Sequence, residues 1–387
     1  MVHSVTGIAV IGSTGSIGCQ TLDVLRGLSP AYRVVGLTAG RNLELLAAQM
    51  VEFRPDVIGA NADGAAAELK RLDTPGHAFQ FATPEEIASH PDVDLVVVGT
   101  MGKAGLGPTL AALRAGKDVA LANKEVLVMA GELVMAEARR HGRMVRPVDS
   151  EHSAIWQCLW GEDEAALDRI ILTASGGALR DRSLDELAKV TPEEALRHPT
   201  WNMGAKITVD CANLINKGME TIEAHWLFGL PQDRVDVVLH RESIVHSLVE
   251  MRDGSVKAQL GVPDMRLPIR CALTYPDRLD SDEVPRLDLA AVGGLTFGKV
   301  DHQRFPCLNM VMEAGRKGGT YPAALAAADE VAVEHFLNRR IGFMDIPHVI
   351  EDTVAAHPSV SSPDIETILD VDAWARRYAN NLVATRA

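Results

Sequence analysis

The sequence predicts an α/β protein with an N-terminal parallel sheet, a second α/β domain and a small C-terminal helical domain. Short apolar runs alternate with helical patterns from Gly7 to Val148, which is typical of a doubly wound parallel sheet. The pattern changes after His152. Near the C-terminus, apolar residues recur at helical spacing: Ala323, Leu325, Ala326, Ala327, Val331, Val333, Phe336 and Leu337. At 387 residues, the chain is long enough for about two or three domains.

The first strand, Gly7 to Ile11, runs directly into a glycine-rich turn, Gly12 to Gly18, and then into a helical pattern. In a Rossmann-like fold the backbone N–H groups of such a turn and of the following helix hold a pyrophosphate. The spacing is GxxGxxG, which departs from the commonest fingerprint. The alternative is a glycine-rich turn without a ligand.

The second strand, Tyr32 to Leu37, indicates which dinucleotide is bound. NAD-binding folds usually end this strand with an acid that bonds the ribose hydroxyls. Here the strand is followed by Gly40, Arg41 and Asn42, with no acid. An arginine suits a 2′-phosphate, so the sequence favours NADP.

Further strands are predicted at Val57 to Ala60, Leu95 to Gly99, Asp118 to Ala122 and Met144 to Val148, separated by helical patterns. Ligands of such sheets bind beyond the carboxyl ends of the strands. Several polar residues fall at these ends: Asn123, Lys124, Glu125, Asp149 and Glu151. We therefore expect the site at this edge of the sheet.

The stretch Pro147 to His152 brings two carboxylates, a hydroxyl and an imidazole together. If the backbone stays extended, Asp149 and Glu151 project from one face, where their repulsion is relieved by a shared divalent cation. The alternative is a helix start with Asp149 or Ser150 as N-cap.

The second domain is expected to begin with a buried helical segment, Ile155 to Trp160, and a strand, Arg169 to Thr173. The strand ends in Ser175-Gly176-Gly177, which offers backbone donors and a hydroxyl to an anion. A plain tight turn would look the same. The segment His198 to Gly204 has the composition of a lid that closes over a site, although its Trp201 also suits a core position.

Lys206 to Val209 is predicted as a strand, and a helix is predicted to start at Asp210. On that helix Asn216 and Glu220 are one turn apart and face the same way, with Lys217 beside them. A solvent-exposed helix with salt bridges would give the same pattern. Beyond it, a hairpin is expected within Val249 to Leu260, turning at Asp253-Gly254.

The formal net charge of −14 argues against nucleic acid or an anionic membrane as a partner. The five cysteines form no CxxC pair and no zinc-binding spacing, and they are expected to be free thiols in a reducing compartment. Met1 to Val5 lacks the pattern of a signal peptide, and no apolar run is long enough to span a membrane. We therefore expect a cytoplasmic protein.

In combination and order, several motifs make the sequence resemble the 1-deoxy-D-xylulose 5-phosphate reductoisomerase family. They are Asn123-Lys124-Glu125, Pro147 to His152, Ser175-Gly176-Gly177, His198 to Gly204, and Asn216-Lys217-Gly218-Met219-Glu220. The resemblance runs from Gly12 through Arg266. It implies isomerisation and NADPH-dependent reduction of 1-deoxy-D-xylulose 5-phosphate to 2-C-methyl-D-erythritol 4-phosphate, in the non-mevalonate isoprenoid route.

The resemblance also implies roles for individual residues. A divalent metal, Mg²⁺, Mn²⁺ or Co²⁺, would be held by Asp149, Glu151 and Glu220. The phosphorylated sugar would be bound by Lys124, Ser150, Glu151, Ser175, His198, Cys211, Asn216, Lys217 and Glu220, with Lys124, Glu151 and His198 as catalytic residues. Cys211 stands where the family usually has a serine in the phosphate pocket. NADPH would be bound by Gly12, Ser13, Thr14, Gly15, Ser16, Ile17, Gly40, Arg41, Asn42, Asn123, Glu125, Gly204 and Met265.

The implied protein is a homodimer in which residues 1–149 bind NADPH and residues 150–274 form the catalytic domain with a lid at 197–205. Residues 275–300 would be a linker and residues 301–387 the helical domain. Two other classes stay open from the residues alone. One is an NADP-dependent dehydrogenase of the semialdehyde or homoserine type, and the other is a non-catalytic NADP-binding regulator.

Overall fold

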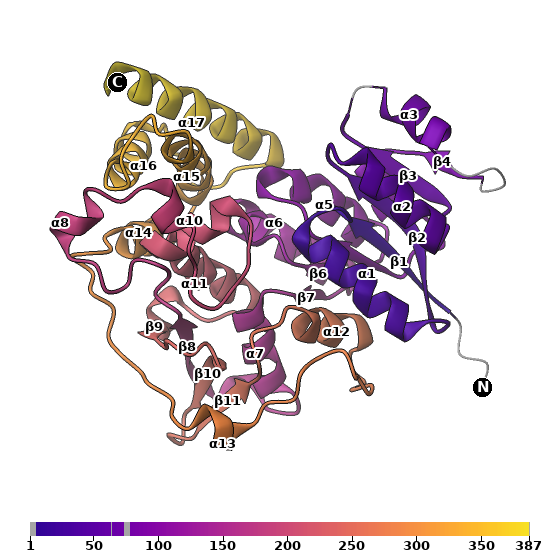
Figure 1. Cartoon of the computed structure of the whole chain (residues 1–387), viewed down its shortest axis with the longest axis horizontal. Coiled ribbons are helices and arrows are strands. Elements are labelled where there is room, and N and C mark those ends of the chain that lie inside the picture. The colour runs from indigo at the N-terminus through magenta and orange to yellow at the C-terminus, as the bar shows by residue number, and fades with distance from the viewer. Residues whose placement is uncertain (1–4, 63, 73–77, 387) are drawn as a thin grey trace. The chain divides into compact units, whose positions relative to one another are not determined.

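The computed structural model describes residues 5–62, 64–72 and 78–386 of the chain, which Figure 1 colours by residue number. Met1–Ser4, part of the segment used above to judge targeting, lies outside the described residues. The chain divides into two compact units. The first contains the described residues up to Val126, with Val134–Ser153 and Asp264–Pro285, and the second contains Leu127–Leu133, Ala154–Pro263 and the residues from Arg286 onward.

The first unit is built on a parallel sheet of seven strands in the order β4-β3-β2-β1-β5-β6-β7. The strands are β1 (Thr6–Ile11), β2 (Tyr32–Ala39), β3 (Val57–Ala60), β4 (Gln80–Phe81), β5 (Leu95–Val98), β6 (Asp118–Leu121) and β7 (Val145–Pro147). The order reverses between β1 and β5, which is the switch point where ligands of this fold bind. The predicted doubly wound sheet is confirmed.

The helices of this unit follow the strands in alternation, as expected for parallel strands joined by crossovers. They are α1 (Ser16–Leu28), α2 (Leu43–Phe53), α3 (Ala65–Leu72), α4 (Pro84–Ala88), the 3₁₀ turn η1 (Gly102–Gly105), α5 (Leu106–Arg114) and α12 (Arg266–Thr274). Helix α6 (Lys124–His141) begins and ends in the first unit, with Leu127–Leu133 counted in the second. Helix α7 (Ser150–Leu159) begins in the first unit and continues into the second. The core consists of the apolar faces of the strands with α1, α2 and α12.

The extended conformation expected after Pro147 is wrong, because α7 begins at Ser150. The Ser153 backbone N–H donates to the Asp149 carbonyl oxygen at 2.8 Å, which closes the first helical turn. Asp149 therefore precedes the helix and Glu151 lies in its first turn. The alternative, a helix start, describes the backbone correctly.

The second unit contains a four-stranded sheet in the order β11-β10-β8-β9. Its strands are β8 (Leu167–Ala174), β9 (Val235–Leu239), β10 (Val245–Met251) and β11 (Val256–Leu260). Strand β10 pairs antiparallel with both β8 and β11, and β8 pairs parallel with β9. The predicted hairpin is therefore confirmed, with its turn at Asp253-Gly254 between β10 and β11.

Helices make up the rest of the second unit. They are η2 (Glu164–Ala166), α8 (Leu184–Leu187), α9 (Pro192–Ala195), α10 (Ala205–Asn213), α11 (Ile215–Phe228), η3 (Gln232–Arg234), α13 (Leu289–Val292), α14 (Cys307–Lys317), α15 (Tyr321–Leu337), α16 (Asp345–Ala356) and α17 (Ile365–Arg386). Helices α15, α16 and α17 pack side by side at the yellow end of the chain in Figure 1 and are the predicted C-terminal helices, within the second unit. Across the residues described, no helix is both long and apolar enough to span a bilayer.

The strand predicted at Lys206 to Val209 is wrong, because these residues lie in α10. The β-branched run Ile207-Thr208-Val209 favours a strand locally, but packing overrides this weak preference. Val209 is fully buried in the core of the second unit, and Lys206 pairs with Asp210 one helical turn away. The helix expected to run on from Asp210 is interrupted at Leu214, whose positive φ of 66° separates α10 from α11.

Candidate active site

The glycine turn in the first unit is shaped by backbone packing. Gly12 has a φ of 91°, a conformation that suits glycine. The Ser13 side chain is fully buried and bonds the Thr38 carbonyl and Gln49 Oε1 at 3.1 and 2.7 Å. Its hydroxyl therefore holds the turn against β2 and α2. Helix α1 begins at Ser16 without a side-chain cap, so its first N–H groups remain available to an anion.

The third glycine of the motif, Gly18, is required by a close contact. A Cβ at Gly18 would lie 2.2 Å from the Gly12 carbonyl oxygen and 2.5 Å from the Ser13 Cα. We expect Gly18→Ala to destabilise the protein by about 1–3 kcal/mol and to weaken NADPH binding, because backbone atoms must move. Gly15→Ala is the control for stability, since its Cβ would lie 3.4 Å from the nearest protein atom. Tm measurements of both variants and an NADPH titration of Gly18→Ala check this, and an equal loss of Tm in both variants would contradict it.

The loop after β2 presents Arg41 to solvent. Its guanidinium forms no ion pair within the described part of the chain. The Asn42 side chain accepts the Leu45 N–H at 3.1 Å and thereby caps α2. Asn42 therefore has a structural task in addition to the cofactor contact predicted from the resemblance.

The carboxyl ends of the neighbouring strands β6 and β7 bring Lys124 and Asp149 together. The Lys124 ammonium forms an ion pair with the Asp149 carboxylate, and only 6% of Lys124 is exposed. Beside it, Asn123 Nδ2 donates to the Gly102 carbonyl at 2.8 Å. The Asn123 Oδ1 atom is buried and accepts no hydrogen bond from the residues described. An acceptor is thus left for a ligand at the predicted edge of the sheet.

The first turn of α7 adds two more predicted residues to this group. Ser150 Oγ donates to Glu151 Oε2 at 2.6 Å. His152, one residue further, is fully buried, and its Nδ1 lies 4.0 Å from Asp149 Oδ2. The strand end and helix start of the first unit thus hold Lys124, Asp149, Ser150 and Glu151 as one polar group.

Helix α11 in the second unit holds three predicted residues on one face. Asn216 Nδ2 donates to Glu220 Oε1 at 2.6 Å, and the Lys217 ammonium pairs with the other carboxylate oxygen. All three are buried, and Glu220 is only 1% exposed. The predicted facing of Asn216 and Glu220 is confirmed, and the alternative of an exposed helix with salt bridges is wrong.

Ser175, at the end of β8, contacts His198 within the second unit. The His198 Nδ1 atom accepts the Trp201 N–H at 2.9 Å, so a neutral His198 carries its proton on Nε2. Nε2 lies 2.9 Å from Ser175 Oγ, which also accepts the Gly177 N–H at 3.2 Å. A serine hydroxyl accepts two hydrogen bonds and donates one, so its own proton is directed to a further acceptor.

The turn at Ser175 also packs against α10. Gly177 has a φ of 65°, and a Cβ there would lie 2.6 Å from the Cys211 carbonyl oxygen. Cys211 is partly exposed, unlike Cys158, Cys271 and Cys307, which are buried. The Arg180 guanidinium donates a hydrogen bond to the Ser175 carbonyl oxygen at 2.9 Å and thereby stabilises the same turn.

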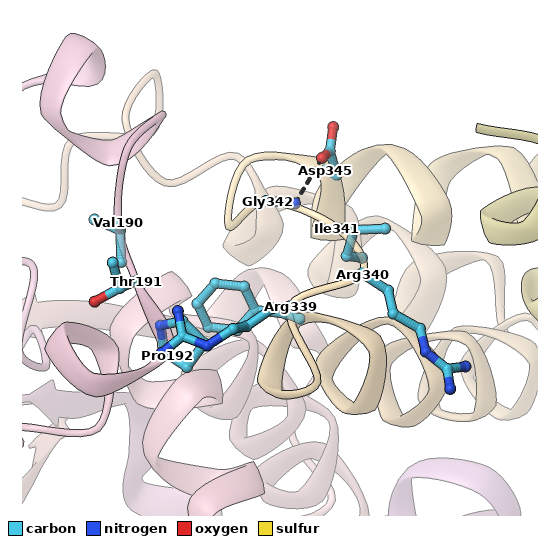
Figure 2. A pocket seen from close by; sticks show the side chains of 9 residues that line it. Val190, Thr191, Pro192, Arg339, Arg340, Ile341, Gly342 and Asp345 are labelled. Carbon is cyan, nitrogen blue, oxygen red and sulfur yellow. Dashed lines mark hydrogen bonds between the residues drawn. The ribbon is translucent and has the colours of Figure 1, made fainter. Parts of the chain in front are cut away.

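A separate hollow of about 380 Å³ lies between α9 and the α15–α16 connection. Figure 2 shows its lining, which includes Thr191, Arg339 and Arg340, and the bond from the Gly342 N–H to Asp345. Arg339 is paired with Glu193. None of the predicted site residues lines this hollow, and we do not assign the active site to it.

Comparison with known proteins gives three family matches along the chain. Residues 8–131 match the model for 1-deoxy-D-xylulose 5-phosphate reductoisomerase, residues 145–228 match its C-terminal domain, and residues 260–378 match the DXP reductoisomerase C-terminal domain. The 1-deoxy-D-xylulose 5-phosphate reductoisomerase of Pelotomaculum thermopropionicum is 52% identical over 97% of this chain and 98% of its own length. The chain belongs to the 1-deoxy-D-xylulose 5-phosphate reductoisomerase family. The enzyme of that name from Gloeobacter violaceus is 51% identical, with 97% of each chain covered.

Solved structures of reductoisomerases share the whole fold. A DOX-P reductoisomerase in complex with NADPH, fosmidomycin and magnesium has a TM-score of 0.93 at 39% identity, with 98% of each chain covered. The reductoisomerase from Zymomonas mobilis in complex with NADPH has a TM-score of 0.92 at 39% identity, covering 98% of this chain and 99% of its own. The family and the fold inferred from the sequence are thus confirmed.

The structure shows how the reductoisomerase motifs are supported locally. It brings Lys124 to Asp149 in the first unit, and Ser175 to His198 and Asn216 to Glu220 in the second. Two supporting residues were not predicted from the sequence: Gln49, which holds the glycine turn, and Arg180, which holds the Ser175 turn. Each acts through a contact distant in sequence, and no local motif marks such residues.

Proposed function

We propose that this chain catalyses the NADPH- and divalent-metal-dependent conversion of 1-deoxy-D-xylulose 5-phosphate to 2-C-methyl-D-erythritol 4-phosphate. The observation that carries the proposal is the 52% identity to a reductoisomerase over 97% of the chain. The resemblance places the reaction in isoprenoid precursor biosynthesis. The dehydrogenase and regulator alternatives are not favoured, since each relative quoted above is a reductoisomerase along nearly its full length.

NADPH is assigned to the glycine turn, the Arg41 loop, Asn123, Glu125, Gly204 and Met265. Three features of the first unit support this assignment. The start of α1 offers uncapped N–H groups, Arg41 is exposed for a 2′-phosphate, and the buried Asn123 Oδ1 lacks a partner within the described residues. A neighbour of the same fold is in complex with NADPH.

The metal is assigned to Asp149, Glu151 and Glu220, and a solved relative of the same fold is in complex with magnesium. Carboxylate oxygens are the ligands that Mg²⁺ prefers, and Mn²⁺ or Co²⁺ accepts the same set. When bound, the metal supplies Lewis-acid polarisation of the ketone and hydroxyl oxygens of the substrate. The Lys124 ammonium partly neutralises the charge of the Asp149 carboxylate. It also offers hydrogen-bond donors to the ketone and hydroxyl oxygens of the substrate.

The substrate phosphate is assigned to Ser175, Cys211, Asn216 and Lys217. His198 and the Gly177 N–H occupy the acceptor sites of the Ser175 oxygen, so its proton points to a phosphate oxygen. His198 thereby connects the loop that carries it to the anion site. Binding of this remote phosphate contributes free energy that orients the reacting carbons.

The pairing of Lys217 with Glu220 has a consequence for ligand binding. The phosphate competes for the Lys217 ammonium, and the metal competes for the Glu220 carboxylate. Binding of either ligand therefore breaks the Lys217–Glu220 ion pair, and the second ligand then no longer has to break it. We infer that metal and substrate bind cooperatively, as expected for two ligands that share one broken ion pair.

The departure at Cys211 leads to a measurable expectation. A thiol is a weaker donor than a hydroxyl, so Cys211→Ser should strengthen one phosphate contact. We expect KM for the substrate to fall by at most about fivefold, which corresponds to about 1 kcal/mol. Steady-state kinetics with Tm as a companion measurement check this. An unchanged or higher KM together with a lower Tm would assign Cys211 to packing instead.

The proposed reaction is tested by incubating the chain with 1-deoxy-D-xylulose 5-phosphate, NADPH and Mg²⁺ and identifying the product by NMR. The expected product is 2-C-methyl-D-erythritol 4-phosphate, formed in equal amount to the NADPH oxidised. NADPH oxidation with homoserine or a semialdehyde in place of this substrate would support the dehydrogenase class. Cofactor binding without turnover would support the regulator class.

We further propose a cytoplasmic homodimer that also accepts Mn²⁺. The family resemblance supports the dimer, and β11 offers an outer strand with Val256 half exposed. The five free cysteines suit a reducing compartment. Light scattering of the purified protein measures its mass, and a monomer at micromolar concentration would contradict the dimer.

A further inference from the structure

A buried ionic cluster joins the start of α10 to α15 in the second unit. The Lys206 ammonium lies 2.6 Å from Asp210 Oδ2 and 2.7 Å from Asp329 Oδ2. Asp329, in the middle of α15, is fully buried, and Asp210 is 3% exposed. The neighbouring Cys307 at the start of α14 has its pKa raised by burial and, to a lesser degree, by the carboxylates of Asp329 and Asp210.

Stability alone does not explain such a cluster. Taking two carboxylates and one ammonium out of water costs desolvation free energy that their attraction seldom exceeds. On the same two helices, Val209, Leu325 and Ala328 belong to the apolar core of the second unit. A well-packed apolar set would serve packing at least as well. What the ions add is a defined geometry, because Lys206 on α10 lies within ion-pair distance of Asp210 on its own helix and of Asp329 on α15.

The placement of α10 matters for two parts of the proposed substrate site. The loop 198–204 ends at Gly204, which is the N-cap of α10, two residues before Lys206. The other end of the loop is held by His198 through Ser175 and the Trp201 N–H. Farther along α10, the Cys211 carbonyl packs against Gly177 of the phosphate turn.

We propose that Lys206 is a positioning residue that ties α10, and with it loop 198–204 and Cys211, to α15 of the C-terminal helical domain. The inference rests on the assignment of this loop and turn to the substrate site. It gives the C-terminal helices a part in catalysis: through Lys206 they set the position of the loop before substrate binds. A loop held in its binding position loses less entropy when substrate binds, which lowers KM.

The same helix offers a matched control. Glu330, next to Asp329, accepts an ion pair from Arg376 at 2.7 Å, and Arg376 also lies 3.0 Å from Asp372. This second cluster has the same composition, one cation and two carboxylates, and it joins α15 to α17. The ion pairs given above link α15 to α17, so the loss of this cluster should destabilise the C-terminal helices without moving the loop.

The test compares Lys206→Met and Asp329→Asn with Arg376→Met and Glu330→Gln in the full-length protein. Lys206→Met should raise KM for 1-deoxy-D-xylulose 5-phosphate by about tenfold or more, with a smaller loss in kcat. Asp329→Asn should act in the same direction to a smaller extent. Both control variants should lower Tm but leave KM within about twofold of the unmodified protein. Trypsin should also cut after the exposed Arg197 faster in Lys206→Met than in Arg376→Met.

The outcome separates positioning from stability. The proposal is overturned if Lys206→Met and Asp329→Asn leave KM unchanged, or if the control variants raise KM equally at the same loss in Tm. If Lys206→Met fails to fold, the test is the comparison of KM between Asp329→Asn and its control Glu330→Gln. KM should then rise in Asp329→Asn and stay unchanged in Glu330→Gln. Absence of turnover in the unmodified protein would instead contradict the proposed function.

Discussion

Replacing Glu220 with glutamine is expected to lower kcat by about a thousandfold, equivalent to about 4 kcal/mol, while the Kd for NADPH stays the same. Glutamine keeps the size of the side chain and its contact with Asn216, but a neutral amide is a weak ligand for a divalent cation. The cofactor turn lies in the first unit and Glu220 in the second, so NADPH titration reports separately on the cofactor. Steady-state kinetics and fluorescence titration measure the two quantities.

Glu223→Gln is the control for this variant. Glu223 lies on the same helix, is equally buried at 1% exposure, and belongs with Asp149 and His152 to a second group of side chains that could hold a metal ion. If Glu220 is the metal ligand, Glu223→Gln should keep most of its kcat even if Tm falls. Equal losses of kcat in the two variants, or a larger loss in Glu223→Gln, would contradict the assignment of the metal to Glu220.

Arg41→Ala is expected to raise KM for NADPH by about ten- to a hundredfold, because a charge-assisted contact with the 2′-phosphate is worth about 1.5–3 kcal/mol. KM for NADH should change little, since NADH lacks that phosphate. The unmodified protein should therefore prefer NADPH strongly. Kinetics with both cofactors measure the preference directly.

Arg33→Ala controls for the loss of one surface cation. Arg33 lies on β2, is similarly accessible and pairs with Asp56 at 2.7 Å. Its removal should leave both KM values unchanged. Equal use of NADPH and NADH by the unmodified protein would show that Arg41 does not bind the 2′-phosphate of NADPH.

Local patterns in the sequence predicted the parallel sheet and the glycine turn of the first unit. The glycine turn and the strand ends are short-range features, and parallel strands place their carboxyl ends along one edge. That edge brings Lys124 next to Asp149, as the strand-end positions predicted. The one-turn spacing of Asn216 and Glu220 likewise predicted their hydrogen bond.

Contacts between segments distant in sequence determine the features of the fold that were not predicted. The β-branched residues after Lys206 favour a strand, yet a buried ion pair with Asp329 and burial of Val209 make the segment helical. The kink of α6 at Ala130 was also not predicted. The Trp226 ring occupies the space beside Gly131, where a Cβ would lie 2.2 Å from it, and no neighbouring residue in the sequence indicates that contact.

The most direct measurement is the metal dependence of NADPH oxidation driven by 1-deoxy-D-xylulose 5-phosphate. The account predicts that oxidation requires both this substrate and a divalent cation, stops when EDTA is added in excess, and returns on addition of Mg²⁺. Fosmidomycin should also inhibit it, because its two chelating oxygens can replace those of the substrate. Substrate-driven oxidation that continues undiminished after exhaustive chelation would contradict the account.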